Sequence, residues 1–178
     1  MSRVGNKPIE IPENIEFEIL DNKIKIKGPY GCLYKEFLSI IHFEIKQNNL
    51  FITRLVETKK AKAYHGLIRV LIQNIILGVT KNYVKILHLE GIGFKFSKEL
   101  NLLTINVGYT HPFKFLIPDT LNVQINSTTK IQIAGPNKEE VTLFADSIRR
   151  IKFPEPYKGK GILYEGEQII KKIGKTRR

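Results

Sequence analysis

The four histidines of the chain are evenly spaced, which raises the question of a metal site. His42, His65, His88 and His111 follow one another at intervals of 23 residues. Zinc sites place such ligands close together, as in H-x-x-x-H on one helix, or combine them with cysteine or carboxylate at a similar spacing. These histidines fall on different expected elements and have no such companions. The even spacing therefore does not predict a metal site.

Motifs for nucleophilic catalysis and for phosphate binding are equally weak. Cys32 is the only cysteine, and neither it nor Ser147 has a nearby histidine that would activate it. Gly91-Ile92-Gly93 lacks the third glycine of a dinucleotide-binding loop, and Gly159-Lys160-Gly161 lacks the Ser or Thr of a Walker loop. We therefore expect no enzyme, no cofactor and no small-molecule substrate. A metal-dependent nucleic-acid enzyme that uses the histidines is the alternative, and metal analysis would distinguish it.

Positive charge is the strongest chemical signal in the sequence. The 178 residues include 29 Lys and Arg against 17 Asp and Glu, for a formal net charge of +12 at pH 7. Such a field attracts polyanions, so nucleic acid is the first expectation and an anionic membrane surface the second. No apolar run approaches the roughly 20 residues that span a bilayer, and the N-terminus has no apolar signal core. We therefore expect no membrane partner.

The charge is concentrated towards the C-terminus. From Phe144 onward there are ten basic and four acidic residues, half of the total excess. Two prolines and two glycines in Phe153–Ile162 exclude a helix interior or a central strand, so lysines and an aromatic ring project from a stiff loop. Such a surface suits the shape and backbone of folded RNA. The candidate RNA-binding residues are Arg149, Arg150, Lys152, Tyr157, Lys158, Lys160, Lys171, Lys172, Lys175, Arg177 and Arg178.

Each part of this surface also has a structural explanation. A second explanation of the lysines in Phe153–Ile162 is that they are solvated side chains without a partner. Basic residues at the C-terminal end of a helix, such as Arg149 and Arg150, interact favourably with the helix dipole, by about 0.3 kcal/mol. Tyr157 either stacks on a base or packs against its own loop, and the sequence leaves this open.

Hydrophobic periodicity predicts the elements that position this surface. Through residues 15–52, apolar residues alternate in short runs with turns such as Gly28-Pro29-Tyr30-Gly31, which is typical of antiparallel strands. The period then changes to i, i+3, i+4, i+7. This predicts an amphipathic helix at about 58–78, with Thr58 as N-cap and Gly78 as terminator.

The same order of patterns recurs about 80 residues later. Alternating runs across 84–133 precede a second helical stripe across 141–151, capped by Asn137 and ended by Pro154. The predicted fold class is α+β, with two similar domains from an internal duplication. Each domain is a small antiparallel sheet packed against one main helix, and a basic C-terminal extension follows. We expect domains at 1–81 and 82–153, and a loop and tail at 154–178.

Motifs along the whole chain resemble one family. They are His65-Gly66-x-x-Arg69-x-Leu71-x-x-Asn74-x-x-x-Gly78-Val79, Gly91-Ile92-Gly93-Phe94, Gly108-Tyr109-Thr110-His111-Pro112, Pro154-Glu155-Pro156-Tyr157-Lys158-Gly159-Lys160-Gly161-Ile162 and Lys172-x-Gly174-Lys175. In this order they resemble the bacterial and organellar large-subunit ribosomal protein numbered six. One departure is Leu163, which stands where the family usually has arginine and so removes one expected phosphate contact.

The resemblance implies a structural protein bound to large-subunit ribosomal RNA. In the family, this protein lies near the base of the acidic-protein stalk and the sarcin–ricin loop region, beside neighbouring ribosomal proteins. The implied RNA contacts are Tyr157, Lys158, Lys160 and the tail cations from Lys171 to Arg178. A free-standing RNA-binding protein is the alternative, and co-sedimentation with large subunits at high salt would distinguish the two.

Composition also gives an expectation about location. Lysine, isoleucine and asparagine are heavily used and tryptophan is absent, a bias that indicates an AT-rich genome. The N-terminus matches the start of the mature family proteins. Together these features favour a ribosome in an organelle with its own genome, a plastid before a mitochondrion, with the bacterial cytoplasm as the alternative.

Overall fold

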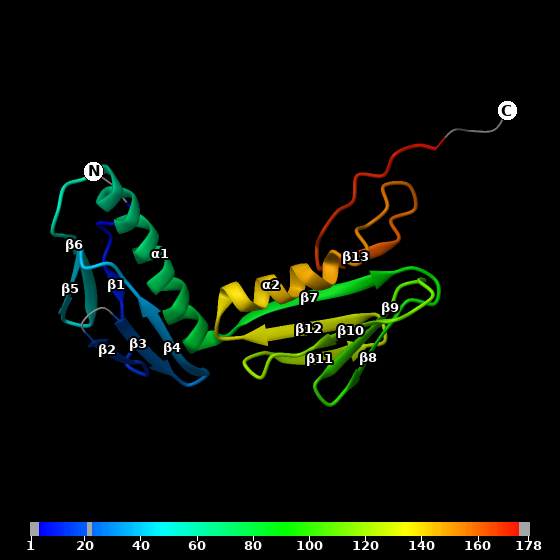
Figure 1. The fold of residues 1–178 in the computed structure, drawn as a ribbon, viewed down its shortest axis with the longest axis horizontal. Helices are drawn as coiled ribbons and strands as arrows, with labels where there is room; N and C mark the ends of the chain where they lie inside the picture. The colour runs from blue at the N-terminus through cyan, green and yellow to red at the C-terminus, as the bar shows by residue number, and fades with distance from the viewer. Residues whose placement is uncertain (1–3, 21–22, 175–178) are drawn as a thin grey trace. The chain divides into compact units, whose positions relative to one another are not determined.

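The computed structural model describes residues 4–20 and 23–174, which form two compact units. Unit 1 comprises the chain to Asn82 with Pro136–Lys138, and unit 2 comprises Tyr83–Gly135 and the chain from Glu139. Figure 1 shows unit 1 in blue to green and unit 2 in green to red. The α+β class predicted from the sequence is confirmed.

Unit 1 contains two three-stranded sheets and one long helix among its described residues. One sheet is the meander β2-β3-β4, and the other has the order β1-β6-β5. The isoleucines that alternate in the sequence, such as Ile24 and Ile26, meet Ile68 and Ile72 of the helix in a closed core. The elements are β1 (Ile9–Glu10), β2 (Glu16–Leu20), β3 (Lys23–Gly28), β4 (Gly31–Glu36), β5 (Ile41–Lys46), β6 (Asn49–Arg54) and α1 (Lys59–Lys81).

The described residues of unit 2 form a three-stranded meander, a four-stranded sheet and one shorter helix. The meander has the order β10-β9-β8, and the larger sheet has the order β11-β12-β7-β13. Leu87, Ile131 and Ile133 of that sheet pack with Ile148 of the helix. The elements are β7 (Tyr83–Glu90), β8 (Lys95–Glu99), β9 (Leu102–Asn106), β10 (Phe113–Leu116), β11 (Asn122–Ser127), β12 (Lys130–Gly135), α2 (Lys138–Arg149) and β13 (Gly161–Tyr164).

The two units repeat one topology. In each, a first strand pairs with the last strand of a hairpin, a three-stranded meander lies between them in sequence, and a helix follows. β1 thus corresponds to β7, the meander β2-β3-β4 to β8-β9-β10, the hairpin β5-β6 to β11-β12, and α1 to α2. The structure therefore supports the internal duplication that the sequence predicts, although each unit has two sheets where one was expected.

Both helices differ from the prediction at their C-terminal ends. Thr58 caps α1 as expected, because its side-chain oxygen accepts from the Ala61 N–H at 3.2 Å. Gly78, however, does not end the helix: α1 continues to Lys81, and the Asn82 N–H donates to the Gly78 carbonyl at 2.9 Å. Gly78 is buried within the helix. α2 begins directly after Asn137 and ends at Arg149, well before Pro154.

Helix α1 is long and apolar enough to cross a membrane by length and composition alone. Its apolar stripe is already occupied within unit 1, since Ile68, Ile72 and Ile76 are buried in the core. Arg69 also attaches the helix to the N-terminal segment, because its guanidinium donates to the Lys7 carbonyl at 3.1 Å and to Gln73 at 2.6 Å. We therefore interpret α1 as a core helix.

Strand β13 contradicts the expectation that everything after Pro154 is loop and tail. Gly161–Tyr164 pairs antiparallel with β7, with Ile162 opposite Leu89 and Leu163 opposite His88. Ile162 is 0% exposed and Leu163 is 1% exposed. The Leu163 side chain therefore contributes to the interior of unit 2.

Candidate nucleic-acid interface

The loop between α2 and β13 is closed by its own backbone. The Glu155 N–H donates to the Lys160 carbonyl at 2.9 Å, and the Gly159 N–H donates to the Glu155 carbonyl at 2.9 Å. Gly159 has φ of +76°, a left-handed conformation that glycine adopts without strain. The loop is thus a defined turn that its own backbone hydrogen bonds close.

Gly161 is required by packing inside the protein. Its φ is +152°, and a Cβ there would lie 2.6 Å from Cα of Pro154 and 2.8 Å from the Phe153 carbonyl oxygen. Both Gly159 and Gly161 are buried. The protein itself fills the space that a side chain at position 161 would occupy, so glycine there serves internal packing and does not open the backbone to a partner.

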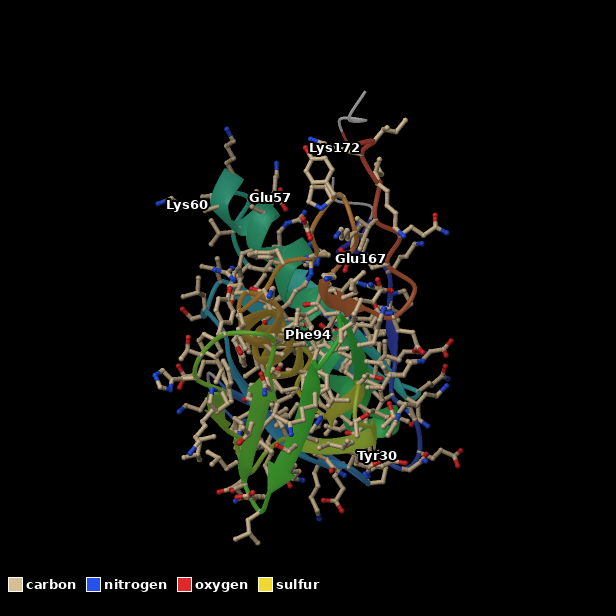
Figure 2. The ribbon with its side chains drawn as sticks, turned by 90° about the vertical axis from the view of Figure 1, so that its right-hand side faces the viewer. Tyr30, Glu57, Lys60, Phe94, Glu167 and Lys172 are labelled. Carbon is tan, nitrogen blue, oxygen red and sulfur yellow. The ribbon has the colours of Figure 1, made fainter. Side chains whose placement is uncertain are left out.

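Four lysines gather on and beside this loop, and we call Lys158, Lys160, Lys171 and Lys172 the loop lysines. All four are exposed. The Lys172 N–H donates to the Pro156 carbonyl at 2.8 Å, which attaches the tail to the loop. Figure 1 shows the two segments side by side, and Figure 2 labels Lys172. Within residues 4–20 and 23–174, no carboxylate pairs with any loop lysine, so their charges remain available to an anion.

Tyr157 lies at the same loop. Its side chain is 53% exposed, and no described residue stacks on its ring or hydrogen-bonds to its hydroxyl. The ring therefore does not hold the loop in shape through such contacts. An exposed aromatic ring among unpaired lysines can stack on an unpaired base.

Arg149 is engaged inside unit 2. Its guanidinium donates to the Glu167 carboxylate, and it lies 5.2 Å from the Tyr164 ring centre and 5.5 Å from that of Phe153. Glu167 also accepts from the Tyr164 N–H at 3.2 Å, so the arginine fixes the turn after β13. Burial is the main reason that the pKa of the Tyr164 hydroxyl is raised above its ordinary value.

Lys152 is engaged as well. Its Nζ donates to the Val107 carbonyl at 2.7 Å and lies 4.7 Å from the Phe94 ring centre and 5.1 Å from the Tyr109 ring centre. Arg150 differs from both, because its side chain is 71% exposed and pairs with Asp146 at 2.7 Å. The structure thus brings the loop lysines and Tyr157 together on the surface, while Arg149 and Lys152 lie beneath it.

Three predicted tail residues, Lys175, Arg177 and Arg178, lie outside the described residues. Sequence reasoning also missed the partners of the two half-buried cations, Arg149 and Lys152. Phe94 and Tyr109 come from loops distant in sequence from Lys152, and Glu167 follows a strand that was not expected. Only the glycine-aromatic motifs around Phe94 and Tyr109 signalled that these loops have a special role.

The histidines lie on separate elements, as expected. His65 is 1% exposed and sits on α1, where its Nδ1 lies 2.7 Å from the Arg54 guanidinium and its Nε2 lies 2.8 Å from the Ile52 carbonyl oxygen. Because a guanidinium only donates, Nδ1 accepts and the ring proton is on Nε2. Its hydrogen bonds make this histidine a core residue. In the described part of the chain, no three His, Cys, Asp or Glu residues group as metal ligands.

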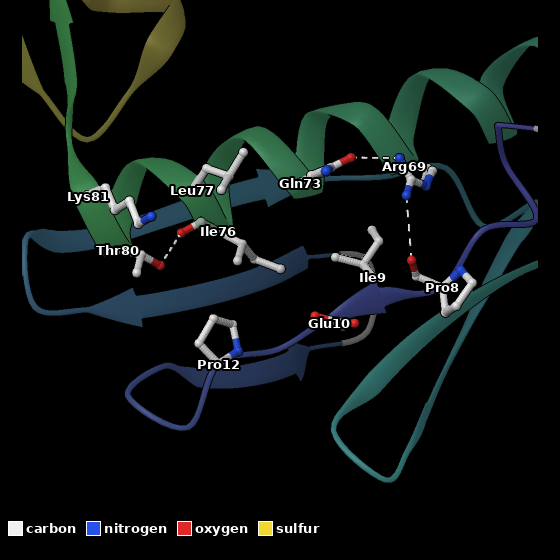
Figure 3. A pocket seen from close by; sticks show the side chains of 10 residues that line it. All are labelled: Pro8, Ile9, Glu10, Pro12, Arg69, Gln73, Ile76, Leu77, Thr80 and Lys81. Atoms are coloured by element: carbon white, nitrogen blue, oxygen red, sulfur yellow. Dashed lines mark hydrogen bonds between the residues drawn. The ribbon is translucent and has the colours of Figure 1, made fainter.

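A pocket of about 400 Å³ in unit 1 lies between β1 and α1. Figure 3 shows Arg69 at one end, with its guanidinium directed at Gln73 and Pro8. Apart from Glu10, Lys81 and this arginine, its walls are prolines, aliphatic side chains and short polar side chains. No nucleophile with an activating base lines it, so we assign it no catalytic role.

Comparison with known proteins decides the family. Residues 11–82 and 90–165 match the profile described as ribosomal protein L6. The chain belongs to the ribosomal protein L6 family. Large ribosomal subunit protein uL6 of Geobacter metallireducens is 40% identical over 176 residues, which cover 99% of this chain and 98% of the relative.

Two further members of the L6 family show the same full-length similarity. Large ribosomal subunit protein uL6c of Phaeodactylum tricornutum is 41% identical over 99% of both chains. Large ribosomal subunit protein uL6 of Dictyoglomus thermophilum is 44% identical over 99% of this chain and 98% of the relative. The matched segments include both units of the L6 fold and extend through β13.

Proposed function

We propose that this L6-family chain is a structural component of the large ribosomal subunit that supports translation by binding large-subunit ribosomal RNA. Its relatives are named as proteins of that subunit, and such proteins are not enzymes. The observation that carries the RNA contact is the set of four unpaired loop lysines around an exposed tyrosine. Lys175, Arg177 and Arg178 extend the proposed contact along the tail, and Arg150 lies at its margin.

The test is the salt dependence of RNA binding. Each lysine that contacts a phosphate releases counterions on binding, so its loss lowers the slope of log K against log salt by about one. We expect Lys158→Ala with Lys160→Ala, in the full chain, to weaken binding to protein-free large-subunit rRNA and to lower the slope by about two. An unchanged slope would show that these lysines do not contact phosphate.

The matched control lies in unit 1. Lys25 and Lys27 both lie on strand β3, but Glu18 pairs with Lys25 at 2.9 Å and Glu16 pairs with Lys27 at 3.0 Å. We expect Lys25→Ala with Lys27→Ala to leave both the affinity and the slope near those of the wild type. An equal effect of the two double variants would indicate binding through net charge alone.

The place of binding is a further part of the proposal. We propose a site near the stalk base and the sarcin–ricin loop region, beside neighbouring ribosomal proteins, on the strength of the family resemblance. A photo-crosslinker at Lys158 should attach to nucleotides of that region in assembled subunits. Crosslinks to another region of the rRNA would refute the location, and failure to sediment with subunits at high salt would favour a free-standing RNA-binding protein.

For the cellular location, we propose the ribosomes of an organelle, with a plastid favoured. The composition bias supports this, and so does the full-length similarity to the relative named uL6c. Bacterial relatives match at similar identity. Fractionation of the source cells should place the protein with plastid ribosomes, and recovery from cytoplasmic ribosomes alone would contradict this.

A further inference from the structure

The segment from Phe153 to Glu167 carries half of the loop lysines, and a cation lies at each of its ends. Lys152 precedes the segment, and Arg149 reaches across to Glu167 where the segment ends. Both residues belong to the basic cluster that the sequence assigns to RNA. Their contacts within unit 2 give them a different task.

The Lys152 ammonium has little room for a phosphate. Its Nζ donates to the Val107 carbonyl at 2.7 Å, and the rings of Phe94 and Tyr109 cover it at 4.7 and 5.1 Å. A cation within about 6 Å of a ring centre is attracted to the ring face, and two rings at once fix its place. The Phe94 ring in turn occupies the space above Gly91 and Gly108, where an added Cβ would lie 2.6 and 3.1 Å from ring carbons.

These contacts join three chain segments at the start of the loop. Tyr109 donates from its hydroxyl to the Ile151 carbonyl at 3.3 Å, so its loop is attached to the end of α2 beside Lys152. The Ile162 N–H donates to the Lys152 carbonyl at 3.0 Å, which ties the same residue to β13. The main chain and the side chain of Lys152 therefore both hold the base of the loop.

Arg149 holds the other end of the segment, at Glu167. Its charge is balanced by Glu167, and its guanidinium lies over both Phe153 and Tyr164, the residues that flank the loop and β13. Its Nε is buried without a hydrogen-bond partner in the described residues, so this face of the guanidinium is closed to solvent. A phosphate that bound Arg149 would compete with the Glu167 carboxylate for its guanidinium. Figure 2 labels Phe94 and Glu167, the partners of the two cations.

We propose that Lys152 and Arg149 are positioning residues for the RNA interface, which fix both ends of the loop segment and contact no phosphate. This rests on the proposed function of the loop lysines, and it assigns the basic cluster two separate roles. Binding sites need such supporting residues, because a contact surface that is free to move loses affinity when it is ordered. The lysines on the loop then bind, and the two cations below them hold the loop in place.

The experiment compares affinity with salt slope in the full chain. We expect Lys152→Met and Arg149→Met each to weaken binding to protein-free large-subunit rRNA about fivefold, because the ring contacts are lost, while the slope stays that of the wild type. Lys152→Arg keeps a cation between the rings and should restore most of the affinity. If Lys152→Met does not fold, Lys152→Gln keeps a donor for Val107 without the charge and replaces it.

The matched control is Lys98→Met in β8, a strand of the meander of unit 2, whose side chain reaches β11 at the edge of the larger sheet opposite β13. Lys98 also donates to a backbone carbonyl, that of Val123, at 2.8 Å. We expect this variant to lose stability without losing RNA affinity. Equal losses of affinity in the Lys98 and Lys152 variants would reduce Lys152 to a general structural role and overturn the proposal.

Two other results would also overturn it. A slope lowered by about one in Lys152→Met would make Lys152 a phosphate contact, and an unchanged affinity would remove its positioning role. Failure of the proposed function is recognised separately, because it leaves the slope unchanged when Lys158 and Lys160 are replaced. Hydrogen exchange should show faster opening of residues 154–160 in the Lys152 and Arg149 variants, and not in the control.

Discussion

The two units share one order of strands and helix, yet they differ in how they use lysine. On the meander of unit 1, Lys23, Lys25 and Lys27 each face a glutamate across the sheet, at 2.7, 2.9 and 3.0 Å. In unit 2, the loop lysines project from a segment that has no counterpart in unit 1, and no described carboxylate pairs with them. The duplicated fold is therefore a scaffold, and the added segment supplies the proposed RNA contact.

The first prediction concerns that added segment. A chain that stops after Phe153 loses β13, and with it the buried side chains of Ile162 and Leu163. Each such side chain contributes about 2–5 kcal/mol, which together approaches the whole stability of a small domain. We expect unit 2 to unfold while the strands and helix of unit 1 keep their hydrogen-exchange protection.

Loss of unit 2 on truncation would also affect a test of RNA binding. The truncation would abolish incorporation into subunits, but it would do so by removing fold and contact together. If unit 2 stayed protected after the truncation, β13 would be dispensable and the two units would be energetically alike. The lysine substitutions described above separate the two effects.

The second prediction concerns the glycine that joins loop and strand. Gly161→Ala places a methyl group 2.6 Å from Cα of Pro154 at φ of +152°. We expect a loss of about 2–4 kcal/mol in urea unfolding of unit 2. Gly166→Ala is the control, because Gly166 has φ of +81° with no atom within 4 Å and should cost about 1 kcal/mol. Equal losses would show that packing at Gly161 is unimportant.

The third prediction would make unit 1 resemble unit 2 in its charges. Glu16→Gln with Glu18→Gln removes the carboxylates that pair with Lys27 and Lys25. We expect the affinity for an unrelated RNA at low salt to rise about threefold, with a steeper salt slope. Glu10→Gln with Glu13→Gln changes the net charge equally without releasing a paired lysine. If this control gave the same rise, net charge and not pairing would distinguish the units.

The fourth prediction is a small effect of pH on unit 1. Hydrogen bonds from Lys23 and Arg54 lower the pKa of Glu36 and Glu57, respectively, below the ordinary value of 4.5. A carboxylate with a lowered pKa in the folded state stabilises the protein above its unfolded pKa, and this contribution is lost as the pH falls through the folded value. At pH values below about 4.5, we expect unit 1 to unfold at lower urea concentrations than at neutral pH. The decrease should be smaller in the double variant Glu36→Gln with Glu57→Gln. Identical acid sensitivity in that variant would contradict the assignment.

The sequence predicted those features that local periodicity encodes. The alternation around Ile24 and the helical stripe of α1 were recognised because burial of one face repeats every two or every 3.6 residues. β13 was missed because prolines and glycines precede it and its partner β7 lies far earlier in the chain. The division of the basic cluster was missed for a similar reason. Whether Lys152 meets a ring or solvent depends on Phe94 and Tyr109, and no local pattern records that contact.

The pairing of β13 with β7 also sets an order of events during synthesis. A chain emerges from its N-terminus, and domains generally fold as units in that order. Unit 1 has all its strands and its helix once the chain has passed Lys81. The first strand of unit 2 pairs with β12 on one side, but its second partner, β13, is made only after α2 and the loop. The loop lysines are therefore set in place among the last events of folding. If the loop lysines bind RNA as proposed, this order delays RNA binding until both units have folded.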